Sequence, residues 1–426
     1  MNNFDVIVVG AGPSGMMAAI SAAESGAEVA LIDKNRQVGR KLLLTGGGRC
    51  NVTNSGTIED ILDNVPGNGR FLHSAFAQFD NHGIMEFFRK NGVALKEEDH
   101  GRMFPVSNRA RTIVDALFER LTAAGVKFFP EQAVTQLCIE NAQIVGLETT
   151  VGHFSAEKVI LSTGGRAYPG TGSTGDGYKL AESAGHSITP LYATESALIS
   201  SEKFIADKSL QGISLRNVQL SVLNSKNKVL VSHQHDLIFT HFGLSGPAAL
   251  RCSSFINKEL LKGAENVTVQ LDFFPESRTA ELAQKILSLS KNSEKNLVNT
   301  LSSLIPERLL VFLFSKSGLA PDMPGKQLNP RQAEDFAKLA KSLSIRIDKT
   351  FPIEKSFVTG GGVNLREVNP KTLESKLTHG LYLTGELLDI NGYTGGYNVT
   401  CAFVTGWVAG YHATRCETRP LGSVEI

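Results

Sequence analysis

Residues 4–34 read FDVIVVGAGPSGMMAAISAAESGAEVALIDK, and this stretch determines the fold. Residues 4–9 form a short β-branched apolar run, which is typical of a strand buried on both faces. An Ala-rich helical segment follows and ends near Gly26, and residues 28–34 indicate a second buried strand. We therefore expect a βαβ unit with parallel strands and a right-handed crossover.

The turn between the first strand and the helix carries the motif GxGxxG at Gly10, Gly12 and Gly15. Gly10 permits a tight turn, Gly12 lets a diphosphate approach the backbone, and Gly15 lets the helix pack closely. The helix N-terminus offers N–H groups to phosphates. Asp33 ends the second strand, where a carboxylate can accept from ribose hydroxyls. A plain glycine turn is the alternative, but the strand and helix context favours a site for FAD or NAD.

Composition limits the classes of partner. The 426 residues include 43 Lys plus Arg and 42 Asp plus Glu, and this balance argues against nucleic acid as a partner. No apolar run reaches about 18 residues, so we expect no membrane span. The start lacks a basic segment and the five cysteines form no CxxC pair, so we expect a cytoplasmic protein without structural disulfides.

The pattern of elements suggests a dinucleotide domain built from both ends of the chain. We expect its parts at residues 1–190 and 346–426, with an inserted domain at 191–345. Expected elements are helices at 70–90, 109–124 and 175–185, an antiparallel meander over 126–163, strands over 191–275, helices over 277–342, and a last helix opened by the glycines near 395.

Five later motifs carry a resemblance to a known family: residues 39–54, GRKLLLTGGGRCNVTN; 162–178, STGGRAYPGTGSTGDGY; 239–250, FTHFGLSGPAAL; 357–363, FVTGGGV; and 383–398, LTGELLDINGYTGGYN. In this order they closely resemble the HI0933-like family of bacterial flavoproteins. The resemblance implies an α/β fold with a Rossmann-like FAD-binding domain of the glutathione-reductase type. It also implies an inserted β-barrel-like and helical domain, and FAD as the cofactor.

The resemblance further implies which residues contact FAD. They lie in the glycine turn, at strand ends and in three later loops: Gly10, Ala11, Gly12, Pro13, Ser14, Gly15, Asp33, Lys34, Arg40, Lys41, Gly46, Gly47, Asn51, Val134, Thr163, Gly164, Gly165, Gly385, Glu386, Asp389, Gly395, Gly396, Tyr397 and Asn398. Glu386 stands where relatives carry an Asp whose carboxylate binds the ribityl hydroxyls of FAD, and Glu keeps this acceptor while lengthening its reach. Independently, Gly395 and Gly396 open a helix whose N–H groups would stabilise negative charge on a reduced flavin.

Two further motifs suggest a dithiol relay and a second dinucleotide site, but their sequence context disfavours both functions. Cys50 lies in the glycine-rich loop, but the residue five positions later is Ser55, so a dithiol–disulfide relay is not expected. Residues 170–175, GTGSTG, repeat the GxGxxG spacing, but four residues separate this segment from the preceding strand motif. A second dinucleotide site therefore lacks the strand–turn–helix context that the motif requires.

The sequence does not define catalytic residues, and the candidates that it offers are His241 and Tyr393. Alternation in HQHDLIFTH places His233, His235 and His241 on one strand face if the strand has no bulge. Metal ligation by these histidines is possible in principle, but packed or exposed strand histidines are commoner, and we expect no metal.

The function expected first is an FAD-dependent oxidoreductase that takes a hydride from a small amine or aminoketone and is reoxidised by oxygen. The alternative is an NAD(P)H-dependent flavin reductase that acts on an activated C=C bond. A third class is an FAD-bearing protein that modifies or binds RNA, which the neutral charge disfavours. The expected partners are a small-molecule substrate with NAD(P)H or oxygen.

Overall fold

The computed structural model describes residues 2–415 and divides the chain into two compact units. Unit 1 comprises Met1–Leu191 and Val358–Ile426, and unit 2 comprises Tyr192–Phe357. The second break follows Phe357 rather than residue 345, because β16 (Leu343–Ile347) and β17 (Lys349–Thr350) pair with strands of unit 2. Cys416 lies outside the described residues.

Unit 1 is built on a seven-stranded sheet with the order β6-β2-β1-β9-β8-β7, and β19 also pairs with β9. Its strands are β1 (Asn2–Val9), β2 (Val29–Ile32), β6 (Lys127–Phe129), β7 (Val134–Glu140), β8 (Gln143–Thr149), β9 (His153–Leu161) and β19 (Leu381–Leu383). β1 pairs in parallel with β2, as the βαβ pattern predicts, and also with β9, while β7, β8 and β9 form an antiparallel meander. The prediction was wrong for β6, which pairs in parallel with β2 at the opposite edge.

Helices and a small sheet surround this framework. The helices of unit 1 are α1 (Pro13–Glu24), α2 (Ile58–Asp63), α3 (His73–Phe76), α4 (Asn81–Lys90), α5 (Ala110–Ala123), α6 (Asp176–Ser183) and α13 (Tyr397–Ala413). A three-stranded antiparallel sheet has the order β3-β5-β4, with β3 at Thr53–Asn54, β4 at Leu95–Glu98 and β5 at Arg102–Pro105. Two further short strands mark the boundaries of the insert in the chain: β10 (Tyr192–Thr194) begins unit 2, and β18 (Val358–Gly360) begins the second segment of unit 1.

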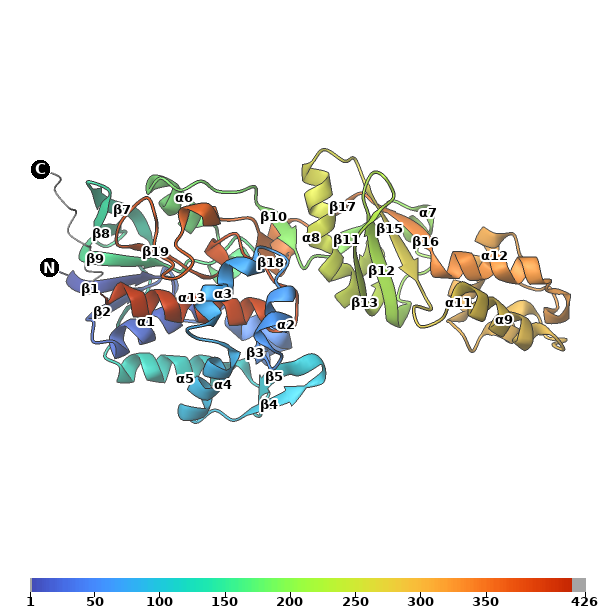
Figure 1. The fold of residues 1–426 in the computed structure, drawn as a ribbon, viewed down its shortest axis with the longest axis horizontal. Helices are drawn as coiled ribbons and strands as arrows, with labels where there is room; N and C mark the ends of the chain where they lie inside the picture. Colours follow the sequence, from blue (N-terminus) through green and yellow to red (C-terminus); the bar gives the residue numbers. More distant parts are fainter. Residues whose placement is uncertain (1, 416–426) are drawn as a thin grey trace, which may run out of the picture. The chain divides into compact units, whose positions relative to one another are not determined.

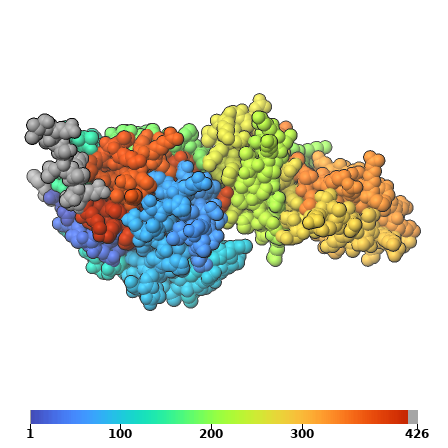
Figure 2. All heavy atoms as spheres, viewed as in Figure 1, coloured from blue at the N-terminus to red at the C-terminus, as the bar shows by residue number. Residues whose placement is uncertain are grey.

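The first and last helices of unit 1, α1 and α13, lie side by side although they come from opposite ends of the chain (Figure 1). On the face of unit 1 that Figure 2 shows, atoms from the two ends of the sequence, coloured blue and red, adjoin one another. A Cβ built at Gly406 would lie 2.1 Å from the carbonyl oxygen of Ser14, and one at Gly410 would lie 2.2 Å from that of Ala18. Only glycine permits this approach. The two glycines therefore lock α13 against α1 with both helices running in the same direction.

Unit 2 contains a second seven-stranded sheet with the order β16-β15-β12-β13-β14-β11-β17. The strands not yet given are β11 (Leu198–Ile199), β12 (Ser214–Leu223), β13 (Val229–Phe239), β14 (Gly243–Ser245) and β15 (Val267–Asp272). β16 and β17 end this order on opposite sides, yet only Asp348 separates them in the chain. The sheet must therefore curl until its edges adjoin, which gives the expected barrel-like form.

The helices of unit 2 complete its core. They are α7 (Lys203–Ala206), α8 (Pro247–Leu261), α9 (Thr279–Ser290), α10 (Leu297–Leu301), α11 (Glu307–Ser317) and α12 (Pro330–Lys341). α8 packs on β12 and β13, and α9 packs on α12. One buried apolar cluster runs from the sheet into these helices, as with Phe239 and Phe336. Within residues 2–415, no helix has the length and apolar character needed to span a membrane.

Candidate cofactor site

In the glycine turn at the start of α1, close packing requires glycine at two positions, whereas the third glycine borders free space. A Cβ at Gly10 would lie 2.5 Å from the carbonyl oxygen of Ser162, and one at Gly15 would lie 1.8 Å from that of Gly10. A Cβ at Gly12 would meet nothing within 4 Å. Gly10 and Gly15 are therefore required by the fold itself, whereas Gly12 leaves space beside the first turn of the helix.

That open space faces an uncapped helix N-terminus. Gly12 is the N-cap residue of α1 and supplies no side-chain cap, and Pro13 follows at the first helical position. The next amides therefore lack an intrahelical acceptor, which favours an anion at this end. Asp33 holds the turn in place, because its Oδ2 accepts from the N–H of Ala11 at 2.6 Å and its Oδ1 accepts from that of Asn35 at 2.7 Å.

The ends of β9 and β19 meet the start of α1 through hydroxyl groups. The Ser14 hydroxyl donates to Thr384 Oγ1 at 2.8 Å, and Ser162 Oγ lies 2.7 Å from the same oxygen. A Cβ at Gly385 would lie 3.1 Å from the Cβ of Ser14. The predicted segment from Thr163 to Gly165 therefore begins beside the glycine turn. Thr384 is not among the predicted site residues, because its role depends on two partners that are distant in the chain.

Lys41 and Glu386 form a half-buried ion pair next to this junction, with 2.7 Å between Nζ and Oε2. Glu386 Oε1 accepts from the backbone N–H of Thr359 at 2.8 Å. A Cβ at Gly165 would lie 2.9 Å from that same oxygen, so glycine is needed there. The structure thus brings three predicted site residues together, from three separate motifs.

Tyr178 and Asp389 lie near the same ion pair. Burial and the charges of Glu386 and Asp389 raise the pKa of the Tyr178 hydroxyl, so it stays protonated. This hydroxyl is buried and has no hydrogen-bond partner among residues 2–415. The Asp389 backbone carbonyl accepts from the side chain of Asn68 at 2.7 Å. The Tyr178 hydroxyl is thus a buried donor near the carboxylates of Glu386 and Asp389, and it suits a polar group of a ligand, such as a ribityl hydroxyl.

The second glycine-rich motif folds against the first dinucleotide site. The Arg40 guanidinium donates to the carbonyl oxygen of Gly170 at 2.9 Å. The Lys34 ammonium contacts both Thr174 and Asp176. No strand directly precedes this segment, since a 3-10 turn leads into it. The motif therefore lacks the geometry of a second dinucleotide site, and Lys34 and Arg40 hold it near the first.

A second part of the site lies where the glycine-rich loop meets the start of α13. Gly46, Gly47 and Gly48 all have left-handed backbones, with φ of 57°, 66° and 84°, and all three are exposed. Asn51 Oδ1 is buried and has no hydrogen-bond partner among residues 2–415. A Cβ at Gly396 would lie 3.0 Å from that oxygen. This orphaned acceptor suits an N–H donor of a bound ring.

The start of α13 is also uncapped. Gly396 is its N-cap residue with φ of 97° and supplies no side-chain cap. The Asn398 side chain closes the preceding loop, because it accepts from the N–H of Gly392 at 2.8 Å and donates to the carbonyl of Gly392 at 2.7 Å. Tyr393 and Tyr397 are both 7% exposed. The helix therefore presents backbone amides, framed by two buried tyrosines, to the region beside Asn51.

The packing of α13 on α1 sets the distance between the two helix N-termini that present free backbone amides. Gly406 meets Ser14 near the start of α1, whereas α13 begins at Tyr397. Gly406 lies nine positions after Tyr397, which corresponds to about 13.5 Å along the helix at 1.5 Å per residue. Two helix N-termini thus point in one direction at different depths. A diphosphate at α1 and a flavin ring at α13 fit this arrangement, so the residues suit FAD.

Val134 and Cys50, both singled out in the sequence, also have defined places. Val134 begins β7, two residues after Gln132, whose N–H binds the carbonyl of Asp33 at 3.0 Å. Val134 therefore lies near the strand end that carries the predicted ribose acceptor. Cys50 is fully buried, and burial raises the pKa of its thiol to about 12. A buried thiol with a raised pKa is a poor nucleophile.

The histidines of unit 2 do not share one strand face. β13 ends at Phe239, so His233 and His235 lie on it while His241 lies beyond it, exposed and edge-on to Phe242. The expected alternation therefore fails at His241, because the strand ends first. Burial and the charges of Arg251 and His235 lower the pKa of His233 to about 4. The nearby Arg251 disfavours a cation at His233 and His235.

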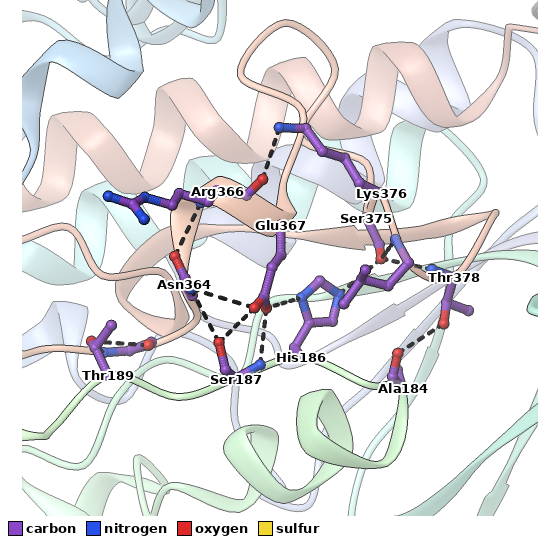
Figure 3. Close-up of polar contacts among 12 residues, drawn as sticks. Ala184, His186, Ser187, Thr189, Asn364, Arg366, Glu367, Ser375, Lys376 and Thr378 are labelled. Carbon is purple, nitrogen blue, oxygen red and sulfur yellow. Dashed lines mark hydrogen bonds and ion pairs between the residues drawn. The ribbon is translucent and has the colours of Figure 1, made fainter.

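A Ser–His–Glu arrangement in unit 1 resembles a hydrolytic triad, but its hydrogen bonds hold two segments of the chain together (Figure 3). His186 Nε2 lies 2.8 Å from Ser375 Oγ, and Nδ1 lies 3.3 Å from Glu367 Oε2. Ser375 is 7% exposed, and its Oγ accepts the N–H groups of Leu377 and Thr378. A buried hydroxyl engaged in three contacts cannot attack a substrate. The cluster joins the end of α6 to the loop before β19.

Comparisons with known proteins agree with this architecture. The family model of the HI0933-like protein Rossmann domain matches residues 4–412. The 3-dehydro-bile acid delta(4,6)-reductase of Clostridium scindens is 32% identical over 410 residues, which cover 95% of this chain and 97% of that protein. The ribosomal RNA dihydrouridine synthase of Escherichia coli is 31% identical over 419 residues, which cover 96% of this chain and 97% of that protein.

Among solved structures, the 3-ketosteroid delta1-dehydrogenase of Sterolibacterium denitrificans has a TM-score of 0.50 at 14% identity, over 97% of this chain and 100% of that one. At this identity the likeness shows a shared fold. The fold and the dinucleotide turn define an FAD-dependent oxidoreductase of the Rossmann type. The chain belongs to the HI0933-like family.

Proposed function

We propose that this enzyme reduces a C=C bond conjugated to a carbonyl group. The observation that carries the proposal is the chemistry shared by the two relatives that match almost the whole chain. One is named for reducing a 3-dehydro-bile acid at delta(4,6), and the other for making dihydrouridine. Both names describe addition of two hydrogens to a double bond that is conjugated to a carbonyl, on otherwise unrelated molecules.

The residues at the site suit this chemistry. Reduced FAD, when bound, supplies a hydride to the carbon β to the carbonyl. The amides at the start of α1 favour the diphosphate, and those at the start of α13, after Gly396, favour negative charge on the flavin. A proton must also reach the neighbouring carbon, and Tyr393 is the candidate donor within unit 1. Tyr393 is 7% exposed and lies in the loop that opens α13.

The source of the electrons is the second part of the proposal. NAD(P)H is the ordinary donor for such a reductase, and the repeated glycine motif at 170–175 packs against the first dinucleotide site. We therefore propose that a nicotinamide nucleotide reduces the flavin without a Rossmann domain of its own. Anaerobic mixing with NADH and NADPH tests this by the loss of flavin absorbance at a saturable rate.

The acceptor is tested separately from the donor. Dithionite-reduced, FAD-loaded enzyme is mixed anaerobically with 2-cyclohexenone, with a 3-oxo steroid that carries 4,6 double bonds, or with saturated cyclohexanone. We expect the two conjugated ketones to reoxidise the flavin and to gain two hydrogens by mass, and cyclohexanone to do neither. Reoxidation by oxygen alone, together with reduction of oxidised enzyme by aminoacetone, would favour amine oxidation instead.

A second candidate is reduction of uridine in ribosomal RNA, which the Escherichia coli relative favours. The near-neutral charge of the chain offers little general attraction for RNA. The same anaerobic experiment with ribosomal RNA distinguishes the candidates. Reoxidation by RNA, with dihydrouridine found on digestion, would select the RNA substrate; reoxidation by the steroid alone would select the small molecule.

A further inference from the structure

The meander at the edge of the unit 1 sheet gathers three side chains that commonly bind metals. Cys138 lies on β7, Glu148 on β8 and His153 on β9. The Sγ of Cys138, a carboxylate oxygen of Glu148 and a ring nitrogen of His153 all lie within 4.8 Å of one another. These residues have no place in the cofactor site described above.

Strand pairing explains why the three groups meet. Glu148 lies directly opposite His153, and Cys138 lies opposite Gly146, one diagonal step from Glu148. Such diagonal neighbours are within reach of each other on one face of an antiparallel sheet. The sequence spacing matches no metal motif, so only the register of the three strands reveals the set.

We propose that Cys138, Glu148 and His153 bind one divalent zinc ion, with water as the fourth ligand. A thiolate, an imidazole and a carboxylate are the ligand types that zinc prefers in a tetrahedral site. Zinc bond lengths put such ligand atoms about 3.5 Å apart, so small side-chain rotations complete the site. The side chains of His153 and Glu148 are 49% and 43% exposed, which leaves room for the water.

The surroundings of His153 already have the form of a metal ligand's outer shell. Its Nδ1 lies 2.8 Å from Glu148 Oε1, and its Nε2 lies 3.1 Å from Ser155 Oγ. With zinc on Nδ1, the Nε2–H donates to Ser155 and holds the ring in place. The charge of Glu140 also lies near the Cys138 thiol and adds to the attraction for a cation. Zinc would then fasten the edge strand β7 to β8 and β9.

The experiment uses the FAD-loaded full chain, stripped with EDTA, exposed to zinc chloride and desalted. Metal content is measured by mass spectrometry, and alkylation of Cys138 by iodoacetamide is followed by peptide mapping. We expect one zinc per chain and at least about tenfold slower alkylation of Cys138 when zinc is present. Flavin absorbance reports that each protein remains folded and loaded.

Cys138→Ser and His153→Ala should each lower zinc affinity by at least about tenfold, which corresponds to about 1.4 kcal/mol. His379→Ala is the matched control, because His379 forms a similar pair with Glu374 at 2.8 Å and belongs to no three-ligand group within residues 2–415. It should keep the zinc. Equal zinc content in wild type and Cys138→Ser, or alkylation of Cys138 that zinc does not slow, would overturn the proposal.

Discussion

Lys41 Nζ lies 2.7 Å from Glu386 Oε2, although 345 positions separate the two residues. The pair joins the glycine-rich loop to the carboxyl end of β19, and neither side chain is more than 24% exposed. Glu386 also accepts the N–H of Thr359, so one carboxylate fixes three segments of the chain. The same carboxylate is the predicted acceptor for a ribityl hydroxyl.

Replacement of Glu386 therefore tests cofactor binding. Glu386→Ala should weaken FAD binding by more than about tenfold, because it removes both the predicted acceptor and the partner of Lys41. Glu386→Gln keeps an oxygen acceptor and should weaken binding less. Titration of apoprotein with FAD, followed by flavin fluorescence, measures both constants. Lys338→Ala breaks an exposed pair with Glu334 and serves as the control; an Ala variant of Glu386 that matches this control would contradict the assignment.

Two glycines of the same motif should respond in opposite ways to alanine. Gly12 has an extended backbone with φ of −78° and free space at its Cβ, so Gly12→Ala should leave the apoprotein as stable as wild type. The added methyl occupies the predicted diphosphate position and should weaken FAD binding by more than about tenfold. Gly15→Ala places a Cβ 1.8 Å from a backbone oxygen and should prevent stable folding. Thermal denaturation with and without FAD separates the two effects.

Gly406→Ala tests the helix contact that sets the spacing of the site. The added Cβ would lie 2.1 Å from the Ser14 carbonyl oxygen, so α13 must move away from α1. Overpacking of this kind costs about 1–3 kcal/mol, and we expect a lower melting temperature of the apoprotein together with weaker FAD binding. Gly170→Ala, at an exposed position without a positive φ and with no atom within 4 Å of the added Cβ, is the control for the melting temperature of the apoprotein.

The sequence predicted features that depend on neighbours in the chain. The first βαβ unit and the distinct roles of Gly10, Gly12 and Gly15 follow from local patterns, and the structure confirms the pairing of β1 with β2. The contacts of Thr384 depend on partners far away in the chain, and no local pattern encodes them. β6 was misplaced because a short apolar run does not reveal its partner strand.

The His186 cluster makes stability depend on pH. Burial lowers the pKa of His186 below 6.5, although the charge of Glu367 acts to raise it. The unfolded chain therefore takes up a proton that the folded chain resists, so stability should fall as the pH drops below about 6.5. Glu367 should also make the folded state less stable as the pH falls, in a lower pH range. Its pKa in the folded chain is held down by the Ser187 hydroxyl and amide despite burial.

Urea denaturation at several pH values between about 7.5 and 5 checks this prediction. His186→Asn should be less stable than wild type at neutral pH, because it loses contacts with Ser375 and Glu367, but its midpoint should vary less with pH. His233→Asn should also reduce the pH dependence, since burial holds that imidazole neutral down to about pH 4. Parallel pH curves for wild type and His186→Asn would show that His186 does not titrate on unfolding.

Cys50 offers a test of how electrons leave the flavin. Its thiol is fully buried, burial raises its pKa to about 12, and no second cysteine follows in the same loop. We expect native Cys50 to resist iodoacetamide at about pH 8, where a free cysteine reacts readily. Cys50→Ala should leave the rates of flavin reduction and enone-driven reoxidation within about twofold of wild type, because no thiol takes part. A large loss of reoxidation rate with FAD still bound would mean that Cys50 acts in the reaction, and the hydride would then not pass directly from flavin to substrate.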